Sequence, residues 1–266
     1  MKPLVGAFTL LTVIPVPFVG DGNGDPDPGS GPSKFAPLFF PVVGLAIGLV
    51  MAAAFALFDL FLPVMVTAAL ALVLGVALTG ALHVDGLADF ADGVFGGRDA
   101  ADRLRIMKLP DVGAFGVVAV VLVVLVDWTA ISSLGALDTW VVLALAGLVS
   151  RTAPLVVMSI TQYVSVQGPG QGLGHGYSGL SRAALAGATL VTLAGAFVIG
   201  GWLALGVAIA GLLTALVVGV IARRRLGGAT GDVYGASVEL AFAVCVIGAV
   251  AVADAGEKLE PIWVSL

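Results

Sequence analysis

Six long stretches of this chain are almost free of charged residues, and they constrain its fold more than any other feature. Of the 266 residues, 59% are hydrophobic and 11% are charged, whereas about 25% are charged in soluble domains. Lipid tolerates only backbone that is hydrogen-bonded within its own segment, so each stretch is predicted to be a membrane helix. The stretches comprise residues 35–58, 60–82, 112–135, 139–160, 183–222 and 236–253.

The fifth stretch is too long for a single membrane helix. Its 40 residues would span about 60 Å as a helix, twice the roughly 30 Å hydrocarbon core of a bilayer. We therefore expect two helices, with a break at Gly200 and Gly201. The sequence thus predicts an all-α, polytopic transmembrane bundle of about six or seven helices, forming one domain over residues 1–266. The N-terminal apolar run, interrupted by Pro15 and Pro17, is predicted to be a short embedded or re-entrant segment.

Charge is distributed unevenly between the connecting segments. Counting membrane crossings places residues 83–111, 161–182 and 223–235 on one side, and Lys and Arg gather there, whereas the opposite connections near Asp59, Asp138 and Gly201 carry none. The positive-inside rule then predicts a multi-pass protein of the cell membrane whose charged side faces the cytoplasm. A net charge of -5 argues against nucleic acid as a partner.

The first chemistry-bearing motif runs from His83 to Gly93 and holds three carboxylates, those of Asp85, Asp89 and Asp92. In a helix, offsets of four and seven residues place these carboxylates on one face. Their repulsion favours a bound Mg²⁺ or Mn²⁺ shared with a substrate phosphate, and a proton or cation pathway is the alternative. His83 lies off that face, and its role as a base, a substrate contact or an interfacial histidine stays open.

The second motif follows Arg223–Arg225 and includes Gly227, Gly228, Thr230, Gly231, Asp232 and Glu239. We expect Asp232 to complete the metal site opposite the three aspartates, and Thr230 with the glycines to hold a phosphate through open backbone N–H groups. A plain helix-capping turn is the alternative. Glu239, seven residues after Asp232, adds a second carboxylate to that helical face and is expected to contact substrate. The Gly-rich segment 167–176 is either a loop that closes over a ligand or a connector.

These motifs resemble, in their order along nearly the whole chain, the cobalamin synthase family, also called the adenosylcobinamide-GDP ribazoletransferases. The most specific matches are His83–Gly93 and Gly227–Asp232, supported by the runs 8–17, 40–44, 78–82, 106–108 and 113–116 and by Arg98. One departure is the run Leu109–Val112, where the family usually has an Asp-Ser-Arg-like sequence.

The resemblance implies a Mg²⁺-dependent transfer in which a hydroxyl of α-ribazole, or of its 5′-phosphate, attacks adenosylcobinamide-GDP and expels GMP. It implies catalytic roles for His83, Asp85, Asp89 and Asp92, metal ligation by those three aspartates with Asp232, and substrate contacts from Arg98 or Lys108. The implied partners are the corrinoid nucleotide, the α-ribazole substrate and the lipid bilayer, with a homo-oligomer or association with other cobalamin-assembly enzymes left open. The rivals are a CDP-alcohol phosphotransferase, whose Asp-Gly-x-x-Ala-Arg pattern is not reproduced, and an ion-coupled transporter.

Overall fold

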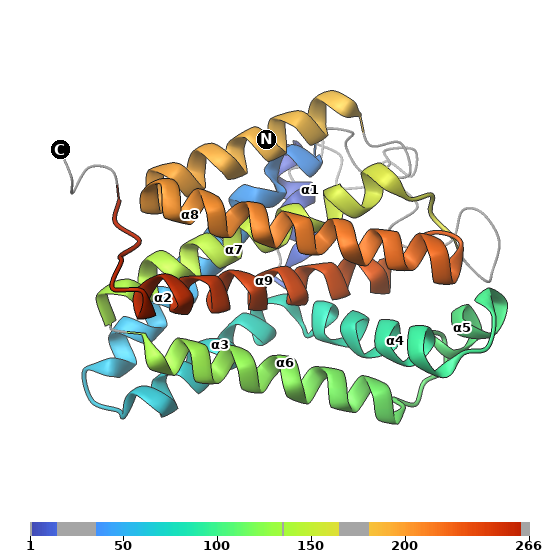
Figure 1. The fold of residues 1–266 in the computed structure, drawn as a ribbon, viewed down its shortest axis with the longest axis horizontal. Coiled ribbons are helices and arrows are strands. Elements are labelled where there is room, and N and C mark those ends of the chain that lie inside the picture. The colour runs from blue at the N-terminus through green and yellow to red at the C-terminus, as the bar shows by residue number, and fades with distance from the viewer. Residues whose placement is uncertain (1, 15–35, 135, 165–180, 262–266) are drawn as a thin grey trace, which may run out of the picture.

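The computed structural model describes residues 2–14, 36–134, 136–164 and 181–261, and their regular structure is helical apart from one isolated bridge between Tyr163 and Ala229. The predicted loop segment 167–176 lies outside these residues. Figure 1 shows the helices in a single bundle. They are α1 (Lys2–Leu11), the 3-10 helix η1 (Ala36–Phe39), α2 (Phe40–Asp59), α3 (Val64–Thr79), α4 (Leu82–Gly96), α5 (Ala100–Ile106), α6 (Ala114–Ser133), α7 (Ala136–Ile160), α8 (Arg182–Leu226) and α9 (Gly231–Asp254).

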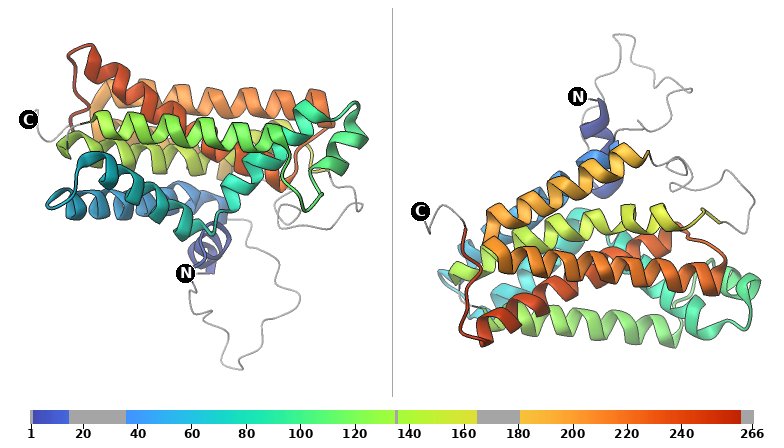
Figure 2. Two further views of the ribbon diagram at one scale, coloured as in Figure 1. Left: turned by 90° about the horizontal axis from the view of Figure 1, so that it is seen from below. Right: turned by 45° about the horizontal axis from the view of Figure 1, so that its top comes forward.

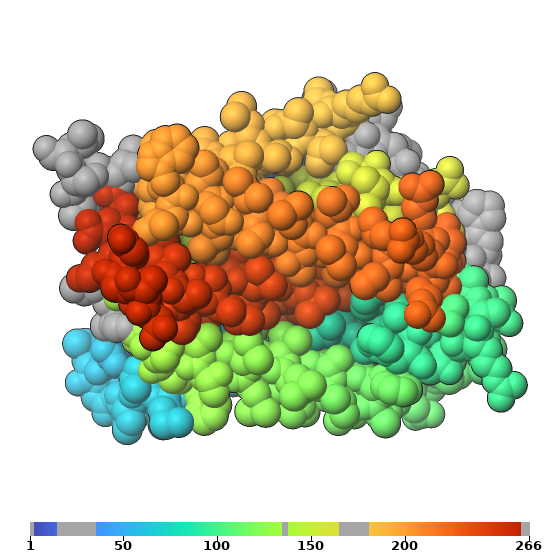
Figure 3. Space-filling model, in the orientation of Figure 1, coloured from blue at the N-terminus to red at the C-terminus, as the bar shows by residue number. Residues whose placement is uncertain are grey.

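Helix length and apolarity confirm the predicted transmembrane bundle. Five segments among the described residues are long and apolar enough to cross a bilayer, and α3 with α4 makes a sixth if this bent pair counts as one span. Apolar side chains such as Val121, Leu125 and Val217 are exposed on α6 and α8. Figure 3 shows α6, α8 and α9 side by side on one face of the molecule. The chain is therefore a multi-pass membrane protein. Helix α1, with ten residues, is too short to span.

The predicted break in the longest apolar stretch is confirmed within α8. Gly200 and Gly201 have non-helical backbone angles there, and Gly201 has φ 66° and ψ -154°, a conformation that is open essentially only to glycine. The two halves of α8 run antiparallel, as Figures 1 and 2 show. At 1.5 Å per residue they are roughly 27 and 37 Å long, against a hydrocarbon core of roughly 30 Å, so each half is close to the length of one membrane span.

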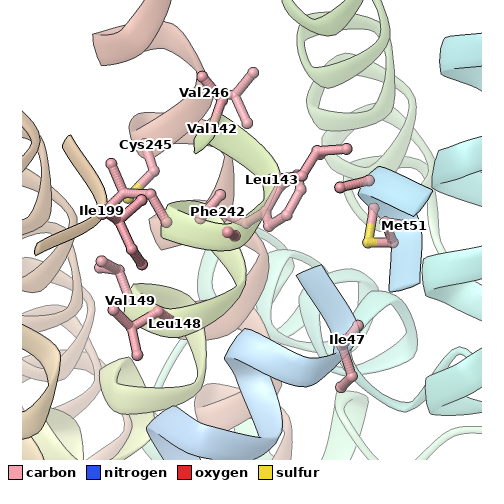
Figure 4. Packing of buried hydrophobic residues seen from close by; sticks show 14 of the residues in the cluster. Ile47, Met51, Val142, Leu143, Leu148, Val149, Ile199, Phe242, Cys245 and Val246 are labelled. Carbon is pink, nitrogen blue, oxygen red and sulfur yellow. The ribbon is translucent and has the colours of Figure 1, made fainter. Parts of the chain in front are cut away.

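Helix α7 forms the centre of the bundle, packed between α2, α8 and α9. Figure 4 shows Leu143 and Leu148 of α7 among apolar side chains of these helices. Close contact with α2 depends on small residues, because a methyl group at Gly44 would overlap the carbonyl oxygen of Gly147 and one at Gly48 would overlap that of Leu143. The Gly44-x-x-x-Gly48 pattern therefore serves helix packing.

A sharp bend between α3 and α4 turns the first acidic motif toward the end of the bundle. The bend is 88°, and Gly80 and Ala81 both have left-handed backbone angles, with φ 60° and 59°. Residues 60–82 were expected to be one helix, and that expectation is wrong at its C-terminal end. At this end Arg103 donates a hydrogen bond to the carbonyl of Arg225, and the backbones of Tyr163 and Ala229 form the isolated β-bridge. The described parts of the three charged segments therefore share one end, as predicted.

Candidate active site

A cavity of about 230 Å³ lies at this charged end of the bundle. Its charged and imidazole side chains come from α4, from the segment after α5 and from the start of α9, and they are His83, Asp85, Lys108 and Asp232. The two motifs singled out in the sequence therefore meet at one cavity, although they are about 150 residues apart in the chain.

Two glycines allow α4 and α9 to cross closely enough to form this site. A methyl group at Gly86 would lie 2.9 Å from the carbonyl oxygen of Asp232, and one at Gly235 would lie 3.2 Å from the backbone of His83. Both distances are tighter than ordinary van der Waals contact. The glycines therefore let the backbone carrying His83 and Asp85 lie directly against the backbone carrying Asp232.

Lys108 and Asp232 form an ion pair at the cavity wall. Lys108 Nζ lies 3.0 Å from Asp232 Oδ2, with side-chain exposures of 49% and 17%, and the Thr230 hydroxyl donates to the same oxygen at 3.0 Å. Partial burial on its own would lower the pKa of Lys108, but the charge and hydrogen bond of Asp232 outweigh it, and the pKa is raised. Lys108 is therefore a cation at neutral pH, beside a carboxylate that faces the cavity.

Asp89 lies one helical turn beyond Asp85 and is half-buried. The charges that act on it most strongly are those of Asp232, Asp85 and Lys108, in that order. No three acidic, His or Cys side chains in the described ranges converge tightly enough to hold a metal by themselves. Mg²⁺ is usually held by one or two carboxylates together with water and substrate phosphates, so one or two of Asp85, Asp89 and Asp232 could hold a metal that a substrate helps to bind.

Asp92, the third aspartate of the motif, contacts a different helix. Its Oδ2 accepts a hydrogen bond from the N–H of Gly113 at 2.6 Å, and its Oδ1 accepts one from Gly116 at 2.9 Å. The side chain is 7% exposed. Asp92 thereby caps the N-terminus of α6 and joins it to α4, a contact that the helical spacing did not predict.

His83 is 4% exposed, and its Nδ1 has no hydrogen-bond partner among the described residues. It lines the cavity beside Asp85. Leaving a buried nitrogen unpaired is costly, so His83, as a residue of the cavity wall, is a candidate to contact a bound ligand.

The remaining predicted residues lie at different positions around this end. Thr230 caps α9 by accepting from the N–H of Val233, and Gly231 is exposed and lines the cavity. Gly227 has φ 81° in the turn that ends α8, whereas Gly228 packs against the carbonyl of Gln162. Arg98 is exposed on the α4–α5 turn and does not line the cavity.

Glu239 lies deeper in the bundle. It lines a separate cavity of about 40 Å³ together with Asp127 of α6 and Arg151 of α7. Among the described residues, Asp127 Oδ1 and Arg151 Nε have no hydrogen-bond partner. Both side chains interrupt apolar stretches of the sequence, which could have marked them as buried polar residues, although not as neighbours of Glu239.

Comparison with known proteins identifies the family of this chain. The profile of the family described as cobalamin-5-phosphate synthase matches residues 3–250. The chain belongs to the cobalamin-5-phosphate synthase family.

Among curated relatives of this synthase family member, a protein of Chlorobium phaeobacteroides is 35% identical over 248 residues, covering 90% of this chain and 93% of the relative. A Pseudomonas putida protein is 38% identical over 250 residues, covering 93% and 98%. Both are named adenosylcobinamide-GDP ribazoletransferase. No solved structure matches the chain. The family predicted from the motifs is confirmed.

Several cavity residues of this synthase family member were missed by sequence reasoning. Tyr234 lies two residues after Asp232, inside the second motif, and its position could have suggested it. Nothing in the sequence marks Tyr163 or Met158 as a cavity residue, because Tyr163 follows the apolar stretch 139–160 and Met158 lies within it. Their neighbours in the cavity wall include Leu10, Leu11, Phe40 and Pro154.

Proposed function

We propose that this protein transfers the phosphocobinamide group of adenosylcobinamide-GDP to α-ribazole or its 5′-phosphate, forming adenosylcobalamin or its 5′-phosphate and releasing GMP. The observation that carries the proposal is the close crossing of α4 and α9 at Gly86 and Gly235, which lines one cavity with groups from both family motifs. The relatives' name describes this transfer.

In the proposed reaction the ribazole hydroxyl oxygen forms a bond to the corrinoid-side phosphorus, and the bond from that phosphorus to the GMP oxygen breaks. The hydroxyl proton passes to a base. His83 suits this role, because its Nδ1 is unpartnered among the described residues and it lines the cavity. Lys108 is placed to contact the negative charge of the transferring phosphate.

Asp89 and Asp232, with Asp85 beside them, would hold the Mg²⁺ that the family resemblance implies. When bound, the ion neutralises phosphate charge and aligns the reacting groups. Asp92 is better suited to positioning α6, since both its oxygens bond to that helix. Glu239, which lines the separate inner cavity, is not assigned a substrate contact.

We also propose that this end of the bundle faces the cytoplasm. Arg98, Arg103, Arg105, Lys108 and Arg223–Arg225 gather there, as the positive-inside rule requires. Nucleotide substrates are available on that side.

The direct test supplies purified protein in detergent with adenosylcobinamide-GDP and α-ribazole, and identifies the corrinoid product by mass spectrometry. We expect a product that contains the ribazole, its loss on chelation with EDTA, and its return with Mg²⁺. Full activity in EDTA would contradict the metal assignment. Transfer from a CDP-alcohol donor, with none from adenosylcobinamide-GDP, would contradict the proposed reaction.

A further inference from the structure

The cavity is divided in chemical character between the elements that line it. Its charged and imidazole groups come from α4, the segment after α5 and α9, whereas α1, α2 and α7 contribute only apolar side chains. These are Leu10, Leu11, Phe40, Pro154 and Met158. Three of the five are well buried, since Phe40 is 1% and Leu11 4% exposed and Pro154 is also buried.

The cavity volume limits which molecule can enter. Pockets for drug-sized ligands measure roughly 300–1,000 Å³, and this cavity measures about 230 Å³. A corrinoid nucleotide is far larger than that, so most of it must remain outside. The smaller substrate of the proposed reaction combines a flat apolar ring system with a polar ribose, which matches the two kinds of wall.

We propose that the apolar wall formed by α1, α2 and α7 binds the base of the ribazole substrate, and that it selects a benzimidazole-type base over a purine. This inference rests on the proposed function. The ribose then points toward His83 and Asp232, where its hydroxyl meets the transferring phosphate.

Selection against purines follows from the chemistry of this wall. A purine carries additional ring nitrogens and, in adenine, an amino group, which lose hydrogen bonds to water on burial. Tyr163 and Tyr234 also line the cavity, but they lie outside α1, α2 and α7. The five apolar side chains of the wall itself offer no N–H or O–H group to replace those bonds, and burying unpaired polar groups is costly. A methyl-substituted benzimidazole loses far fewer such bonds and gains apolar contact.

Met158 offers the sharpest test, because it is half-buried on α7 and its neighbour Ser159 is exposed. For the native protein we expect kcat/KM to be at least about tenfold higher with α-ribazole than with its adenine counterpart. Met158→Trp fills the cavity and is expected to raise the KM for α-ribazole at least about tenfold, while the KM for adenosylcobinamide-GDP changes less than about twofold. Ser159→Trp, the matched control, is expected to alter neither KM.

Met158→Gln retains the side-chain length and supplies a polar group, so it provides a second readout if the tryptophan variant folds poorly. It is expected to narrow the preference for benzimidazole over adenine. A rise in the KM for adenosylcobinamide-GDP alone, or an unchanged preference in both variants, would overturn the inference.

Equilibrium dialysis separates this inference from the proposed function. Labelled α-ribazole is dialysed against the native protein and the Met158 variants without the second substrate. Binding that Met158→Trp weakens and Ser159→Trp leaves intact supports the base site even if no transfer occurs. Undetectable α-ribazole binding to the native protein would overturn it, whatever the transfer assay gives.

Discussion

The three aspartates of α4 differ in what their oxygens contact. Asp85 lines the cavity, Asp89 is half-buried and is affected more by the charge of Asp232 than by that of any other side chain, and Asp92 accepts hydrogen bonds from two N–H groups at the start of α6. Spacing in the sequence correctly predicts a helix with acidic groups, because offsets of four and seven residues are local properties. The partner of each carboxylate depends on which helix packs against α4, and local spacing contains no such information.

Asp92→Asn tests the capping role. The amide replaces one acceptor oxygen with a donor that faces an N–H of Gly113 or Gly116, so we expect the free energy of unfolding to fall by about 1–3 kcal/mol. Thermal unfolding in detergent measures this, with Asp111→Asn at an exposed position as the control. An unchanged melting temperature together with lost activity would place Asp92 in the chemistry instead.

Lys108→Met tests the cation at the cavity. Loss of a charged donor from a reaction site typically costs about 100-fold or more, and we expect a fall of that order in kcat/KM for transfer. Arg105→Met is the matched control, because Arg105 pairs with Asp102 at the surface, with 61% of its side chain exposed, and such pairs contribute little. Equal effects of the two substitutions would contradict a role for Lys108.

At the scale of elements, the crossing of α4 and α9 determines whether the site forms. We expect Gly86→Ala to lower transfer activity at least about tenfold, because its methyl group would meet the carbonyl of Asp232 at 2.9 Å and displace aligned groups. Gly206→Ala in α8, whose methyl group would meet nothing within 4 Å, should leave activity unchanged. Native activity in Gly86→Ala would show that close packing of α4 on α9 is dispensable.

Some helix boundaries could be predicted from the sequence and others could not. The break at Gly200–Gly201 follows from length, since residues 183–222 exceed one membrane span, and glycines mark the place. The bend at Gly80–Ala81 falls inside a continuous apolar stretch, and one of its two left-handed residues is an alanine. The neighbouring segment helps to fix it, because the N–H of Val13 donates to the carbonyl of Leu78 at 2.9 Å. A tertiary contact of this kind leaves no pattern in the local sequence, so the bend could not be predicted.

For the whole molecule, the charged end and the apolar surface together define an orientation in the bilayer. The count of membrane crossings predicted that the three charged segments lie at one end of the bundle. The described parts of these segments do lie together at one end. The convergence of Asp127, Arg151 and Glu239 inside the bundle could not be predicted, because it depends on how α6, α7 and α9 pack together.

Cysteine labelling tests the orientation. Cys245 is fully buried, so it should give little background with an impermeant maleimide. We expect Arg105→Cys to be labelled only in inside-out vesicles, and Leu60→Cys, 79% exposed at the opposite end, only in intact cells. The reverse pattern would place the cavity outside the cytoplasm.

A reaction site at the crossing of α4 and α9 is tested most directly by the rate of GMP release from adenosylcobinamide-GDP and α-ribazole in the Asp232→Asn variant. Asp254→Asn is the matched control, because Asp254 is exposed at the other end of the same helix. We expect Asp232→Asn to lower kcat/KM about 100-fold or more, while Asp254→Asn stays within about twofold of the native protein. Native rates in Asp232→Asn, or equal losses in both variants, would contradict a reaction site at the crossing of α4 and α9.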